Sequence, residues 1–195
     1  MHLFLNTDSP WNTFYTDESG ALQYKTNTPL KLHDRTTTIS RVVEGIPRAD
    51  GREAEAEVED GARFASLAQI NWRQIESSVI HFQGRELATQ EFFRTEGSLG
   101  WFGRPRAFTA LDGKQYKWIL GAFTSEASLK LNDGSETMVA QYHHKKFVYG
   151  MFSKPQKPSL EIAPPFEHMA DEILVTFVYI EQLRKSKDGS QSIVD

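Results

Sequence analysis

Two adjacent histidines in the stretch "YHHKK", residues 142–146, are the side chains best suited to acid–base or metal chemistry. Neighbouring residues of a strand point to opposite faces, so we do not expect His143 and His144 to bind one metal ion. The other four histidines follow no HxH or HExxH spacing, and the chain has no cysteine. The sequence therefore predicts no metal site, and we interpret "YHHKK" as a cationic strand end.

No nucleophile motif or phosphate-binding loop is recognisable elsewhere. The stretch "EGSLG" (96–100) lacks the GxSxG spacing and the strand–turn–helix context of a serine hydrolase. The glycines of "GSLGWFGRPR" (97–106) fit neither GxGxxG nor a P-loop, so we expect no nucleotide and no other cofactor.

If the chain is an enzyme, it would have to use polar groups beside an apolar pocket. Its aromatic content of 12% is suitable for lining such a pocket. Glu91 and Arg94 lie in an apolar context that predicts a partly buried ion pair, an arrangement more often structural than catalytic. The catalytic candidates are Glu91, Arg94, Tyr116, Tyr142 and His143.

Basic residues are frequent between Arg104 and Lys146. Tyr116 and Trp118 flank Lys117 in the expected strand, so Lys117 should point outward and the two rings inward. A cationic strand face of this kind attracts anionic lipid, although an ordinary solvated face has the same pattern. The candidate ligand-binding residues are Arg104, Arg106, Lys114, Lys117, Lys145 and Lys146.

Length and charge restrict the class of protein. A chain of 195 residues is expected to form one domain, and its net charge of −4 argues against a general nucleic-acid binder. The N-terminal residues have no basic leader, and no apolar run approaches the roughly 20 residues that span a bilayer. We expect a cytoplasmic protein, or one bound peripherally at membranes, without a transmembrane segment.

Most of the chain consists of short apolar runs separated by turn signals. Hairpins are predicted within residues 12–29, around Asp112–Gly113 and around Asp133–Gly134. About twelve strand candidates precede residue 165, whereas residues 87–96 fit either a strand or a helix. We expect one folded domain of residues 1–185, which contains an acidic loop or insertion at 49–62 and is followed by a flexible tail at 186–195.

The closing segment "DEILVTFVYIEQLRK", residues 171–185, has conflicting signals. Its valines and isoleucines favour a strand, whereas the acidic residues at its start and the basic residues at its end favour a helix. A helix that is apolar on all sides must be buried on all sides, and a large closed barrel has room for one. The residues alone leave helix and central strand open.

Four stretches in the second half of the chain carry a resemblance to a known superfamily. They are "FTALDGKQYKWIL", "LKLNDGSETMVAQYHH", "SLEI" and the closing segment. This order resembles the tubby C-terminal-like superfamily, which includes tubby proteins, phospholipid scramblases and the plant LURP-one-related proteins. With "INWRQIESSVIHFQG", the chain is more closely similar to domain-of-unknown-function proteins of mushroom-forming fungi, from about Leu3 to Lys185.

The resemblance implies a mainly β fold, a closed antiparallel β-barrel of about twelve strands that encloses a C-terminal hydrophobic α-helix. The helix would comprise residues 170–184. Tubby proteins bind phosphoinositide headgroups through cationic side chains on adjoining strands. Their site is not matched here residue by residue, so no binding residue is carried over.

Two classes of function follow. The first is a non-catalytic binding module that recognises an anionic lipid, a membrane surface or a protein partner. The second is an enzyme or carrier for a small hydrophobic molecule in a barrel cavity, as in fungal secondary metabolism. A closed cavity with ionisable groups would favour the second, and a filled barrel with an external basic groove the first.

Overall fold

The predicted strands form one antiparallel sheet in the computed structural model, which describes residues 1–29, 35–43, 56–59, 61–73, 77–98, 103–121, 126–145 and 157–191. The first strands are β1 (His2–Leu5), β2 (Thr13–Thr16), β3 (Leu22–Asn27), β4 (Thr36–Val42), β5 (Ala56–Glu59), β6 (Ala62–Asn71) and β7 (Val79–Phe82). The remaining strands are β8 (Arg85–Ala88), β9 (Arg94–Thr95), β10 (Arg106–Thr109), β11 (Gln115–Ile119), β12 (Ser128–Leu131), β13 (Met138–His143) and β14 (Ser159–Ile162). The helices are α1 (Thr89–Phe92), the 3-10 helix η1 (Pro164–Met169) and α2 (Ala170–Gln191).

The three predicted hairpins are confirmed. Strands β2 and β3 pair antiparallel across the turn that contains Gly20. Strands β10 and β11 pair across Asp112–Gly113, and β12 and β13 pair across Asp133–Gly134. Gly113 and Gly134 have φ of +80° and +89°, a conformation that favours glycine and explains why these dipeptides mark the turns.

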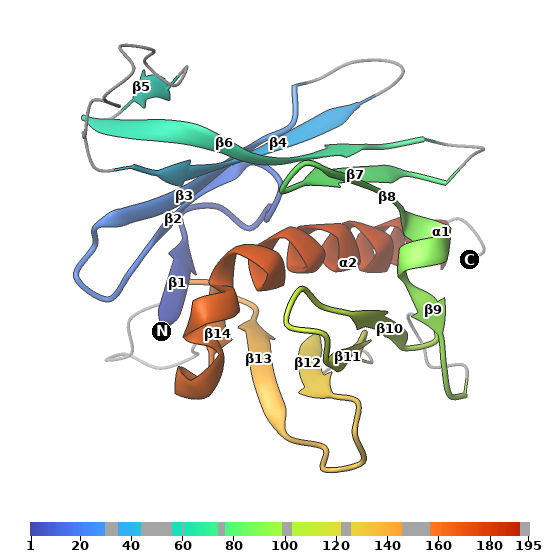
Figure 1. Cartoon of the computed structure of the whole chain (residues 1–195). Coiled ribbons are helices and arrows are strands. Elements are labelled where there is room, and N and C mark those ends of the chain that lie inside the picture. The colour runs from blue at the N-terminus through green and yellow to red at the C-terminus, as the bar shows by residue number, and fades with distance from the viewer. Residues whose placement is uncertain are drawn as a thin grey trace.

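The sheet has 14 strands rather than about twelve, in the order β8-β7-β6-β4-β3-β2-β1-β14-β13-β12-β11-β10-β9, with β5 paired to β6 off this path. Strands β8 and β9 are the two ends of the path, and no pairing joins them in the described part of the chain. They are nevertheless consecutive in sequence, and the single turn of α1 connects them. Figure 1 shows α1 between the two edges, beside the C-terminal part of α2.

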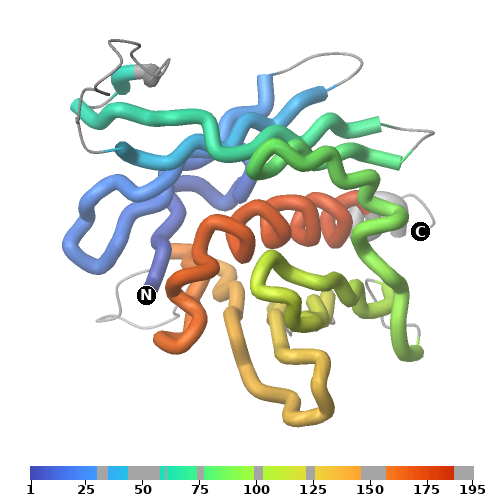
Figure 2. Tube along the Cα trace, in the orientation of Figure 1, coloured from blue at the N-terminus to red at the C-terminus, as the bar shows by residue number. Residues whose placement is uncertain are grey.

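The sheet surrounds the closing helix. In Figures 1 and 2, α2 runs between strands β3, β4, β6, β7 and β8 on one side and β10 to β13 on the other. The segment that was ambiguous in sequence is therefore a helix. Five side chains are at most 1% exposed: Leu174, Val175, Phe177, Val178 and Ile180.

Three segments differ from the expectations. Helix α2 continues to Gln191, into the expected tail. Residues 56–59, part of the expected acidic loop, form β5, while residues 49–55 and 60 lie outside the described residues. Residues 87–96 contain both alternatives, since β8, α1 and β9 follow one another there. No helix among the described residues is long and apolar enough to cross a membrane.

Aromatic side chains of the sheet fill the space around α2. Trp118 and Tyr142 are at most 1% exposed, and their rings contact Phe177 at centroid distances of 6.1 and 4.8 Å. The indole Nε1 of Trp118 also donates to Thr176 Oγ1 at 3.1 Å, so the buried hydroxyl of Thr176 has a partner on the sheet. The rings of Tyr116 and Trp118 point inward, as predicted.

Truncation of Phe177 tests whether α2 is the core of the protein. Phe177→Ala should lower the free energy of unfolding by about 3–5 kcal/mol, because it leaves a cavity between the helix and two strands. Phe177→Leu should cost clearly less, since it keeps most of the buried volume. Urea unfolding measures both variants, and a Phe177→Ala protein as stable as wild type would contradict this packing.

Candidate functional site

The outer face of β9 to β12 carries a row of cationic side chains. Residues that are aligned across neighbouring strands share a face, and the aligned residues here are Arg94, Ala107, Lys117 and Lys130, one from each strand. Ala107 is fully buried in spite of its outward position. We call Arg94, Lys117 and Lys130 the cationic row.

A carboxylate bridges the two lysines of the row. Glu136 Oε1 lies 3.3 Å from Lys117 Nζ, and Glu136 Oε2 lies 3.0 Å from Lys130 Nζ. These hydrogen bonds, the one from Lys130 first, hold the pKa of Glu136 below its ordinary value. Two lysines directly opposite on paired strands repel each other, and the carboxylate between them offsets this repulsion.

The backbone of Glu136 is adapted to this position. Its φ of +56° is in the left-handed region, which a residue with a Cβ adopts at a cost on the order of 1–2 kcal/mol. The turn before it is fixed by the side chain of Asp133, whose Oδ1 accepts from Ser135 N at 2.9 Å. The turn thus places a carboxylate over two ammonium groups, at the position where an external anion would contact them.

The other predicted cations lie elsewhere. Arg106 is aligned with the inward-facing Trp118, so it is on the opposite face from Lys117, and its Nη1 donates to Arg104 O at 3.1 Å. Lys114 is in the β10–β11 turn, 4.0 Å from Asp112. Lys145 follows β13 at the other end of the sheet, 3.8 Å from Asp8, and Lys146 lies outside the described residues.

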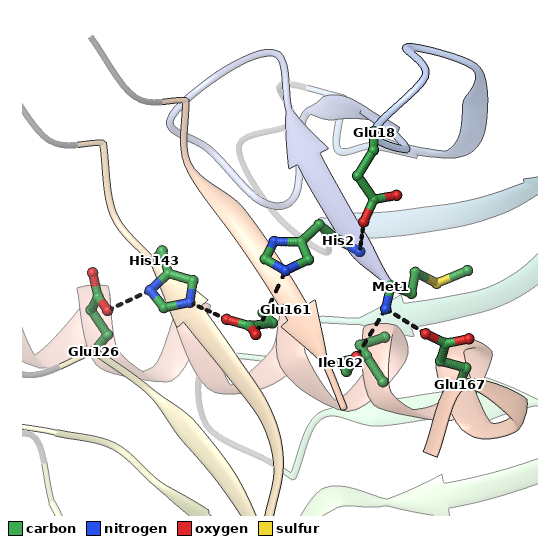
Figure 3. Close-up of polar contacts among 8 residues, drawn as sticks. All are labelled: Met1, His2, Glu18, Glu126, His143, Glu161, Ile162 and Glu167. Carbon is green, nitrogen blue, oxygen red and sulfur yellow. Dashed lines mark hydrogen bonds and ion pairs between the residues drawn. The ribbon is translucent and has the colours of Figure 1, made fainter. Parts of the chain in front are cut away.

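His143 lies on the outer face, and each of its two ring nitrogens contacts a carboxylate (Figure 3). Its Nδ1 is 3.0 Å from Glu126 Oε2, and its Nε2 is 2.9 Å from Glu161 Oε2. Glu161 Oε1 is in turn 3.6 Å from His2 Nε2, which ties β1 to β14 and β13. The hydrogen bond from His143 holds the pKa of Glu161 below its ordinary value. A general base needs a ring nitrogen that faces the substrate, and here carboxylates face both nitrogens.

His144 contacts the helix instead, so the two histidines take different partners, as the strand geometry predicts. Its Nε2 is 3.1 Å from Arg184 Nη1, which donates to Glu181 Oε1 at 2.6 Å. Glu181 is only 1% exposed, and Tyr142 beside it is equally buried. Burial is the main reason that the pKa of the Tyr142 hydroxyl is raised. This buried ion pair was not among the candidate residues.

The five catalytic candidates are not brought together. Glu91 is exposed in α1, and the ion-pair partner of Arg94 among the described residues is Glu96, at 3.5 Å, rather than Glu91. Tyr116 is buried and donates to Asp112 Oδ2 at 2.8 Å, far along the helix from the end where Tyr142 lies. Within the described ranges, no group of three or more His, Asp or Glu side chains is arranged to hold a metal ion.

A second buried carboxylate lies at the start of α2. Glu172 is 6% exposed, and both of its oxygens accept from Leu111 N, at 3.2 and 3.1 Å. Burial raises the pKa of Glu172 from its ordinary value of 4.5, the Leu111 hydrogen bond opposes this shift, and the charge of Asp112 adds to it. Glu172 therefore connects the helix to the β10–β11 turn through a carboxyl group whose pKa is raised by its burial.

Residues 8–186 match the family described as "Family of unknown function (DUF6593)". No curated protein and no solved structure matches the chain.

The buried ion pair of Glu181 and Arg184 in α2 should be energetically coupled, so that the effect of removing one residue depends on the other. Glu181→Leu should destabilise the protein by about 3–5 kcal/mol, because Arg184 loses its carboxylate in a dry environment. The double variant Glu181→Leu/Arg184→Met should recover much of this loss, since neither charge remains. The pair of the exposed Arg41 and the half-buried Asp171 is the control, and Arg41→Ala should cost at most about 1 kcal/mol. A double variant less stable than Glu181→Leu in urea unfolding would contradict the assignment.

Glu172 should make stability depend on pH. Because its pKa is higher in the folded than in the unfolded chain, the folded state binds more protons above pH 4.5, and stability falls as pH rises through the folded pKa. Glu172→Gln keeps an oxygen for the Leu111 N–H and removes the charge. Its melting temperature should therefore exceed that of wild type near pH 7 and approach it at about pH 4. Equal differences at both pH values would exclude this role.

Proposed function

The chain belongs to the DUF6593 family, whose function is unknown, and we propose that it is a non-catalytic binding module whose cationic row takes an anionic lipid headgroup at a membrane surface. The observation that carries the proposal is the bridging carboxylate. Glu136 stands in for the anionic oxygens of a ligand, and it reaches both Lys117 and Lys130 at hydrogen-bond distance or close to it. Cations that already hold one oxyanion in this geometry are suited to hold another.

The arrangement around the row supports a headgroup rather than an isolated anion. Arg94 lies on the same face, separated from Lys117 only by the small Ala107, so the three cations together face one direction. A headgroup that carries more charge than the Glu136 carboxylate would displace it and gain the Arg94 contact as well. The displaced Glu136 would also be free to leave its left-handed conformation.

The interior gives less support to an enzyme or a carrier. The described part of α2 is covered by the sheet along Ile173–Ile180, where the one partly exposed residue, Tyr179, stacks against the rings of Trp72 and Phe93. The space that would hold a hydrophobic substrate is therefore occupied by the side chains of the helix itself. A ligand site on the outer face agrees better with this packing.

The proposal extends to fold and location. We regard the family as a branch of the tubby C-terminal-like superfamily, with α1 completing the barrel between β8 and β9. The order of hairpins and the closing helix inside the sheet support this relationship. The cytoplasm is the matching compartment, because the cytoplasmic leaflet of cellular membranes is the anionic one.

Liposome sedimentation tests the proposal. The protein should bind vesicles that contain phosphatidylserine or a phosphoinositide, and not vesicles of phosphatidylcholine alone. Lys117→Gln/Lys130→Gln should weaken binding roughly 30-fold, because each lysine near a charged surface contributes about 1 kcal/mol. Glu136→Gln should strengthen binding, since it removes the competing carboxylate.

Two matched control variants distinguish binding at the cationic row from a general effect of the protein's net charge. Arg41→Gln/Arg85→Gln removes two charges from exposed residues of β4 and β8, and Glu86→Gln removes one carboxylate from β8. Neither should change binding as much as the variants of the site. Equal effects of site and control variants, or no preference for anionic vesicles, would refute a lipid function for the cationic row.

A further inference from the structure

A hollow lies on the outer surface of β2 and β3, with a volume of about 500 Å³. This is within the range of roughly 300–1,000 Å³ that is typical of small-molecule sites. Its lining includes Asn6 after β1, Phe14 of β2, Lys25 and Asn27 of β3, and Glu59 of β5. None of these residues belongs to the cationic row, which is on β9 to β12.

The base of the hollow is rigid. Thr13 Oγ1 accepts from both Asn6 N and Thr7 N, each at 3.0 Å, and this fixes the loop that leaves β1. The ring of Phe14 packs against the buried Phe64 with 6.0 Å between centroids. Lys25 forms an ion pair with Glu59, which holds β5 against β3. The backbone and the ring that a ligand would meet are therefore held in place, whereas the exposed amides of the lining would become ordered on binding.

Two amide side chains in the lining are available to a ligand. Asn6 and Asn27 are exposed, and neither side chain has a hydrogen bond to any residue in the described part of the chain. An amide offers two N–H donors and one carbonyl acceptor, so it can donate to one hydroxyl and accept from the next. Phe14 between them is half-buried and presents part of its ring, an apolar surface with a negative face.

The chemistry of the lining excludes other ligand classes. An anion would meet one cation, Lys25, whose charge is balanced by Glu59. An extended peptide needs a free strand edge, and the two strands under the hollow offer none, because β2 lies between β1 and β3, and β3 lies between β2 and β4. A purely hydrophobic molecule could contact the half-buried ring of Phe14, but it would leave the two amides and the ion pair without hydrogen bonds from a ligand.

We propose that this hollow, lined by Asn6, Phe14, Asn27 and the Lys25–Glu59 pair, binds a neutral saccharide. The amides and the ion pair would bind its hydroxyls, and the C–H face of a pyranose ring would stack on Phe14. The site is independent of the lipid function, because it lies on other strands and uses no unbalanced charge. The saccharide could belong to a glycoprotein, a polysaccharide or a free oligosaccharide, which share this chemistry.

Saturation-transfer NMR of the full chain with cellotriose, laminaritriose, chitotriose and maltotriose tests the proposal. At least one trisaccharide should receive saturation, with its strongest effect on the C–H protons of one ring face. Binding should hardly change between about 0.05 and 0.5 M salt, because screening affects charged ligands and not neutral ones. This insensitivity distinguishes the hollow from the cationic row. Absence of transfer to all four trisaccharides would overturn the proposal.

Variants then locate the site. Asn6→Ala and Asn27→Ala should each weaken binding roughly 3- to 10-fold, the effect of one lost hydrogen bond. Phe14→Ala should abolish binding, and Phe14→Tyr, which keeps the ring and the packing on Phe64, should retain it. Gln69→Ala, which removes an exposed amide of β6 outside the hollow, is the matched control. Binding that survives Phe14→Ala and Asn27→Ala in a folded protein would place the saccharide elsewhere and refute this site.

Discussion

An α-helix with apolar side chains on every face must be covered on every face, and this requirement shapes the whole protein. A flat sheet covers one side of a helix, so a single sheet can bury α2 only by curling around it. The sheet does so with 14 strands, and its two edge strands end on either side of α1. The one-turn helix α1 connects the edge strands β8 and β9, which are not hydrogen-bonded to each other in the described part of the chain. Burial of α2 thus explains both the curvature of the sheet and the place where its path ends.

The same requirement leaves little room inside the sheet for a ligand. Because the protein's own helix fills the interior, the hollow on β2 and β3 and the cationic row both lie on the outer face of the sheet. The polar groups that remain inside have partners that fix the helix. Thr176 binds Trp118, Glu172 binds the backbone of Leu111, and Glu181 binds Arg184. Each contact costs desolvation, and we interpret their value as setting the rotation and depth of the helix in the sheet.

Local signals in the sequence predict much of this fold. The Asp-Gly turns and the alternation around Tyr116 and Trp118 are effects of neighbouring residues, and the hairpins they predict are present. The closing helix was not decided by its own residues, because Val and Ile favour a strand and only the surrounding sheet makes the helix stable. Strand β5 has a local cause, since it forms a tight hairpin with the adjacent β6 in spite of its acidic sequence.

The candidate site was less predictable for a related reason. Lys117 was expected to point outward and does, but its neighbours depend on how four strands are aligned. Glu136 joins Lys117 and Lys130 across a turn, and Glu126 joins His143 from a different strand connection. Such contacts have no fixed spacing in sequence. The cations that were grouped by proximity along the chain, such as Lys114 and Lys145, are at opposite ends of the sheet.

Amide hydrogen exchange of the native protein tests the central claim, that α2 is the core on which the sheet depends, most directly. Amides of residues 173–180 should exchange only through global unfolding, with the same opening free energy as those of β1, β13 and β14. That free energy should equal the value from urea unfolding. Exchange of α2 through a local opening, while these strands stay protected, would show that the sheet persists without its helix and would contradict the account.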